Sequence, residues 1–192
     1  MVHIVPGTWN WPGKEGQNIR VLAFSNATRV ELFLNGKSLG AKDMPSNAHL
    51  EWQVPYEPGT LSAKAMADGN VAATDEVQTT GAPAAIKLAT DRTTLNPDKQ
   101  DTIVVAVSVL DDKGRVVPNG DQRVTVRLEG DGKLIGIGNG NPADHDPDRA
   151  DNRNTFHGRA AAIVQAGKSA GTLRLIASSP GLSADSLSLD VR

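Results

Sequence analysis

The sequence of 192 residues contains no cysteine. This absence excludes disulfide bonds, zinc sites built from thiolates and cysteine nucleophiles. Aromatic residues are also scarce, at 4% of the chain. The core must therefore be built mainly from Val, Leu, Ile and Ala, and each aromatic residue stands out as a candidate for a specific role.

An excess of charge of one sign is lacking as well. The formal net charge is −2 and no tract of basic residues occurs, so we expect neither nucleic acid nor a membrane as a partner. No apolar run approaches the length needed to cross a bilayer. The first residues have neither the basic start nor the apolar stretch of a secretion signal, so we expect a cytosolic protein or a segment of a longer one.

Helical periodicity is almost absent, whereas short segments of alternating apolar and polar residues recur along the whole chain, separated by Gly, Asn and Asp. This pattern predicts an all-β fold of the sandwich type. Residues 79–84 contain both Gly and Pro and lack apolar alternation, which is typical of a linker. We therefore predict two tandem β-sandwich domains, residues 1–81 and residues 82–192.

Six strands are expected in the first domain. They are residues 19–24, 29–34, 37–42, 49–54, 60–67 and 71–78. Asn35-Gly36 and Asp68-Gly69-Asn70 are hairpin signals, because these residue types tolerate a positive φ. We also expect residues 25–28 to join the first two strands as a hairpin, and the alternation around Trp52 places its side chain in the core.

Seven strands are expected in the second domain. They are residues 85–90, 102–110, 115–118, 123–129, 160–165, 172–177 and 186–191. Residues 138–157 interrupt this rhythm, because they are polar, rich in turn formers and far more numerous than a hairpin needs. A long loop of this kind is usually either functional or disordered.

Three aspartates of this loop occur at every second position. They are Asp144, Asp146 and Asp148. Such spacing can present several oxygens to a hard cation such as Ca²⁺, although the glycine and terminal glutamate of an EF-hand loop are missing. The alternative is a solvated acidic loop without metal, neutralised by nearby arginines. These arginines are Arg149, Arg153 and Arg159.

Two tryptophans lie two positions apart near the start of the chain. In an extended segment, Trp9 and Trp11 would project to one side, close to Asn10 and Lys14. Such a plate could stack on the apolar face of a sugar while the polar neighbours bind its hydroxyls. The alternative is that the indoles pack into the sandwich or against another domain.

Two longer stretches carry a resemblance to a known family. Residues 3–39, with WNWPGKEGQ and VELFLNGKSLG, resemble the domain of unknown function that follows the catalytic barrel in family 2 glycoside hydrolases of the bacterial β-galactosidase type. The second half, with IGIGNGNP, the acidic loop and NTFHGRAAAIV, resembles the final immunoglobulin-like domain of the same enzymes. The resemblance therefore implies two immunoglobulin-like sandwiches.

The resemblance also implies a role. Family 2 enzymes are retaining hydrolases whose two catalytic glutamates lie on the barrel, and this chain has no barrel segment, so we assign no catalytic residue and expect no cofactor. The expected function is an accessory C-terminal region that supports the barrel and contacts a galactoside or plant oligosaccharide. The resemblance places the parent enzyme in the periplasm or outside the bacterial cell. The alternative is a structural spacer or surface-adhesion module that binds no sugar.

Overall fold

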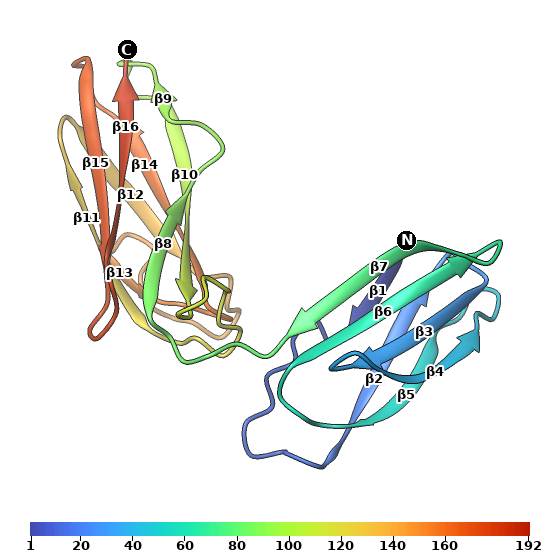
Figure 1. The fold of residues 1–192 in the computed structure, drawn as a ribbon. Helices are drawn as coiled ribbons and strands as arrows, with labels where there is room; N and C mark the ends of the chain where they lie inside the picture. Colours follow the sequence, from blue (N-terminus) through green and yellow to red (C-terminus); the bar gives the residue numbers. More distant parts are fainter. The chain divides into compact units, whose positions relative to one another are not determined.

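The computed structural model describes residues 1–192, which form strands, turns and loops but no helix (Figure 1). The chain accordingly contains no helix that could span a bilayer. It divides into two compact units, Met1–Thr80 (unit 1) and Gly81–Arg192 (unit 2). This division lies one residue before the boundary expected from the sequence.

Unit 1 is a sandwich of two antiparallel sheets. Its strands are β1 (Val2–Val5), β2 (Asn18–Ser25), β3 (Arg29–Leu34), β4 (Lys37–Asp43), β5 (Leu50–Pro55), β6 (Thr60–Ala67) and β7 (Asn70–Gln78). One sheet has the order β1-β2-β5 and the other the order β4-β3-β6-β7. Alternate side chains of these strands, among them Val21, Leu32 and Leu61, are fully buried between the sheets.

Turn chemistry sets two of the connections in unit 1. Asn35 and Gly36, with φ of 51° and 79°, join β3 to β4, and Asp68 and Gly69, with φ of 51° and 77°, join β6 to β7. Both hairpins are therefore confirmed. The hairpin predicted at residues 25–28 is wrong, because β2 pairs with β1 and β5 while β3 pairs with β4 and β6. Alternation fixes which face of a strand is buried but not which strand lies beside it.

Unit 2 is also a two-sheet sandwich. Its strands are β8 (Ala85–Ala89), β9 (Thr94–Leu95), β10 (Thr102–Leu110), β11 (Arg123–Glu129), β12 (Gly132–Gly138), β13 (Asn152–Asn154), β14 (Arg159–Ala166), β15 (Gly171–Ser178) and β16 (Asp185–Val191). The sheet orders are β12-β14-β10-β8 and β13-β11-β15-β16-β9. Side chains such as Val105, Val164 and Leu175 fill the space between the sheets. The prediction of an all-β, immunoglobulin-like sandwich fold is confirmed.

Four strands have no counterpart in the predicted set: β1, β9, β12 and β13. Glycines interrupt the alternation in β12, and β9 and β13 have only two and three residues, so these three strands give no clear period-two signal. Conversely, the predicted strand at 115–118 is not a strand. Only Val116 forms a bridge there, with Leu110.

Candidate functional site

Trp9 lies in the core of unit 1 rather than on its surface. Its side chain is fully buried, and its Nε1–H donates to the backbone oxygen of Glu57 at 2.9 Å. Its ring meets that of Tyr56 edge to face, with 5.4 Å between the centroids. Because residues 7–11 form no strand, Trp9 and Trp11 do not project together. An enclosed indole presents no face to a sugar, so the two-tryptophan plate is wrong.

Asn10 has a structural role at the same place. Its side-chain amide donates to the Thr80 hydroxyl at 2.7 Å, and its Oδ1 accepts the Thr80 N–H at 3.1 Å. The Thr79 hydroxyl donates to the backbone oxygen of Trp9 at 2.5 Å. These bonds fasten the segment of Trp9 and Asn10 to the residues that follow β7.

Trp11 and Lys14 are the two candidates of this segment that remain at the surface. Trp11 is partly buried against the core of unit 1, and the Nζ of Lys14 lies 5.3 Å from the centroid of its ring. The Lys14 N–H also donates to the backbone oxygen of Trp11 at 3.0 Å. Of the four residues proposed to contact sugar, only Trp11 and Lys14 therefore remain as candidates.

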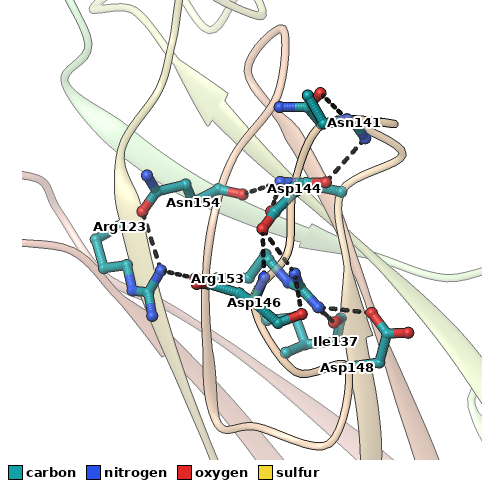
Figure 2. A network of polar contacts seen from close by, with 10 residues as sticks. Arg123, Ile137, Asn141, Asp144, Asp146, Asp148, Arg153 and Asn154 are labelled. Carbon is teal, nitrogen blue, oxygen red and sulfur yellow. Dashed lines mark hydrogen bonds and ion pairs between the residues drawn. The ribbon is translucent and has the colours of Figure 1, made fainter.

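In unit 2, the long polar loop is organised around one buried arginine, Arg153 of β13 (Figure 2). Only 2% of its side chain is exposed. Its Nε and Nη2 donate to the backbone oxygen of Ile137 at 3.2 and 3.0 Å, and its Nη1 donates to the backbone oxygen of Asp146 at 2.9 Å. Because a buried guanidinium needs partners for its five N–H groups, the loop folds around it.

The aspartates of the loop turn toward arginines. Asp144 and Asp148 form ion pairs with Arg153 at 3.1 and 2.6 Å, and Asp146 pairs with the more exposed Arg123. Nowhere in the chain do three His, Asp or Glu side chains come together as metal ligands. The three aspartates therefore do not converge on a cation. Of the arginines expected to neutralise the loop, Arg153 does so. Arg123 also does so, but the sequence did not predict it.

Asp144 links the loop to β13 and to the end of β12. Its Oδ1 accepts the Asp146 N–H at 2.9 Å, and its Oδ2 accepts the Asn139 side-chain amide at 2.6 Å. The Asp146 N–H, the Asn139 amide and Arg153 together lower the pKa of Asp144, against a smaller opposing effect of burial. The carboxylate is therefore ionised at neutral pH, as its contact with Arg153 requires.

A cavity of about 600 Å³ opens beside this loop. It is lined by residues 118–121 before β11 and Arg123 at its start, by residues of the loop (139, 141 and 143–146), and by residues 154–157 at and after the end of β13. Phe156 and His157 form the turn after β13, with ring centroids 4.1 Å apart. Polar amides, carboxylates, an arginine, two imidazoles and one phenyl ring thus line one cavity. The sequence pointed to residues 138–157, which include Phe156, but not to the cavity.

Residues 86–188, more than half of the chain, match the family model described as glycoside hydrolase family 2 C-terminal domain 5. The chain belongs to glycoside hydrolase family 2. Residues 16–73 match a second model, described as a domain of unknown function. The two stretches that carry the resemblance overlap these two matches, and the resemblance is confirmed.

Family 2 proteins similar to this chain are much longer than it. A β-galactosidase of Bacteroides ovatus is 39% identical over 95% of the chain, which spans 21% of that protein. A β-glucuronidase of Formosa agariphila is 32% identical over 67% of the chain, which spans 13% of it. A crystal structure of a family 2 member from Bacteroides cellulosilyticus superposes with a TM-score of 0.95 at 32% identity, covering 97% of this chain and 24% of that one.

Proposed function

We propose that this chain is the non-catalytic C-terminal accessory region of a β-galactosidase-type glycoside hydrolase, where it supports the catalytic barrel. The observation that carries the proposal is the match of 95% of the chain to one fifth of a β-galactosidase. On this proposal, the catalytic barrel belongs to the remaining part of the longer enzyme.

Two carboxylate sites of the chain support the proposal that it is non-catalytic. A retaining glycosidase needs two carboxyl groups roughly 5–5.5 Å apart on either side of the scissile bond. Asp75 and Glu76 are neighbours on β7 and therefore point to opposite faces. Asp111 is buried and accepts hydrogen bonds from Arg115 and from the backbone N–H of Gly81. Neither site therefore offers two carboxyl groups to one scissile bond.

An exposed apolar face in unit 2 supports packing against another part of the enzyme. Val104 on β10 and Ile163 on β14 lie directly opposite each other, and 56% and 37% of their surfaces are exposed. Ala106 and Ala161 are the next pair on the same face. Small and branched side chains make a flat surface that a second element can cover. We assign this face to the remaining part of the longer enzyme.

The test uses the full-length product of the gene that carries this chain. Val104→Lys places a charge on the apolar face and is expected to lower the thermal stability of the full-length enzyme, while the unfolding of the 192-residue chain alone changes little. Thr125→Lys, on an exposed position of β11, is the matched control. Equal stability of the two full-length variants would remove the proposed packing role of this face.

A further inference from the structure

We propose that the cavity beside the long loop of unit 2 binds a neutral saccharide unit. The inference rests on the proposed function, because it gives the accessory region a sugar site of its own. The proposed site lies in unit 2 and not in the tryptophan segment of unit 1, where Trp9 is buried and Asn10 is bound to Thr80.

The size and lining of the cavity suit a sugar. Its volume of about 600 Å³ lies within the roughly 300–1,000 Å³ typical of small-molecule sites. The polar side chains that line it are of types that donate to and accept from hydroxyl groups. They include Asn119, Asp121, Arg123, Asn141, His145 and Asn154. Asp121 forms no hydrogen bond or ion pair within the chain, so its carboxylate is available to accept from a ligand hydroxyl.

One aromatic ring gives the cavity an apolar wall. Phe156 is partly exposed and lines the cavity beside His157. Its backbone N–H donates to the oxygen of Arg159 at 2.8 Å, and the Arg159 N–H donates back at 3.1 Å. His157 and Gly158, with φ of 51° and 71°, close the tight turn between them. The backbone that carries the ring is thereby held in place, and the ring itself contacts His157, with 4.1 Å between the centroids. A ring on a fixed turn can pack on the C–H face of a pyranose at reduced entropic cost.

The polar wall is held in place before any ligand arrives. Arg153 ties the loop to β12 through the Ile137 oxygen and to Asp144 and Asp148 (Figure 2). The Asn139 amide adds bonds to Asp144 at 2.6 Å and to the backbone oxygen of Asn154 at 3.0 Å. A buried charged side chain with this many partners fixes the loop far better than the loop residues could alone. Binding would therefore not have to order the loop.

The charge of the lining selects the class of sugar. Asp121, Asp144 and Asp146 line the cavity, whereas Arg123 is its one arginine and is already paired with Asp146. Asp144 is paired with Arg153 behind the wall, so Asp121 is the lining carboxylate without a cationic partner and the wall carries a small excess of negative charge. The unpaired carboxylate of Asp121 disfavours uronic acids and sulfated sugars, because it would repel a carboxylate or sulfate of the ligand, and it favours ligands that donate hydroxyl hydrogens. The ligand class is a neutral mono- or disaccharide unit.

The test is an NMR titration of the ¹⁵N-labelled 192-residue chain with lactose, cellobiose and, as the anionic comparison, glucuronic acid. The neutral sugars are expected to shift the signals of Asn119, Asn154 and Phe156 and to leave those of Trp11 and Lys14 unchanged. Phe156→Ala should weaken binding about fivefold to tenfold. Asp121→Ala should also weaken it, and Asp121 has no internal partner whose loss would disturb folding. Trp11→Ala is the control and should bind like the unmodified chain.

Three outcomes would overturn the inference. They are the absence of shifts with both neutral sugars at high millimolar concentration, shifts confined to the segment of Trp11 and Lys14, and binding of glucuronic acid at least as strong as that of lactose. None of these outcomes touches the proposed function, which depends on turnover and on packing of the full-length enzyme. Hydrolysis by the chain alone would instead refute the proposed function and leave saccharide binding in the cavity standing.

Discussion

Replacing Arg153 by methionine tests whether one buried cation organises the long loop. Methionine fills much of the space of the arginine stem but removes every donor to Ile137, Asp146, Asp144 and Asp148. Breaking a buried ion pair by removing one partner typically costs about 3–5 kcal/mol, because the other charge is left uncompensated. The pair with Asp148 adds little to this figure, since 89% of that side chain is exposed. We expect a loss of about 3–5 kcal/mol in the free energy of unfolding of unit 2.

The matched control is Arg123→Met. Arg123 belongs to the same network, but 48% of its side chain is exposed and so is 43% of its partner Asp146. An exposed pair of this kind contributes about 0–1 kcal/mol. The two arginines thus contact the same loop but differ in burial, so the difference in stability between their variants isolates the effect of burying the charge. Arg153→Lys should fall between them, because a lysine keeps the charge but cannot form the fork of parallel hydrogen bonds.

The assay uses the uneven distribution of the aromatic residues. Every tryptophan and the single tyrosine lie in unit 1, at positions 9, 11, 52 and 56. Denaturant unfolding followed by indole fluorescence therefore reports on unit 1, whereas far-ultraviolet circular dichroism reports on both units. Arg153→Met should shift the circular dichroism transition and leave the fluorescence transition in place. A loss below about 1 kcal/mol, equal to that of the exposed pair, would refute the assignment of Arg153 as the organiser of the loop.

Two further predictions concern acid and the first unit. Arg92 and the Asn96 N–H lower the pKa of Asp101 to about 2, and the pKa of Asp111 lies still lower because Arg115 and backbone N–H groups outweigh its burial. Since both values lie below the unfolded value of roughly 3.9, this stabilisation is complete above about pH 5 and is lost as the pH falls toward 2 and below. Equal free energies of unfolding in urea at pH 5 and pH 2.5 would contradict it. In unit 1, Trp9→Ala should lower the free energy of unfolding by about 3–5 kcal/mol, as a large-to-small core substitution. The same change at the partly exposed Trp11 should cost less than half as much. Denaturant unfolding followed by the fluorescence of the remaining indoles measures both losses. Equal losses for the two tryptophan variants would refute the burial argument.

Much of the fold follows from local patterns in the sequence. β3, β6, β10 and β11 have the predicted bounds because their apolar residues alternate without interruption. Asn35-Gly36 closes a hairpin because both residues adopt a positive φ. The partners of β2 were not predictable in this way, since residues 25–28 carry no turn signal that distinguishes a hairpin from a crossing between sheets.

The candidate site was predictable only in outline. The polar composition of residues 138–157 identified the loop, because so long a break in the alternation is unusual in a sandwich. It did not show that Arg153 is buried, because arginine between two asparagines reads as an exposed strand end. Nor did the sequence decide between an exposed and a buried Trp9. Its neighbour Asn10 and the proline and glycines around it suggest an exposed loop, while bonds to Thr79 and Thr80 draw the segment inward.

The most direct test of the central claim is a turnover measurement on the purified 192-residue chain. Aryl β-galactoside and aryl β-glucuronide substrates are incubated with the chain and, in parallel, with the full-length enzyme that carries it. The chain alone is expected to release no more product than buffer, whereas the full-length enzyme is active. Hydrolytic activity that coelutes with the chain in size-exclusion chromatography would contradict the assignment of the chain as a non-catalytic accessory region.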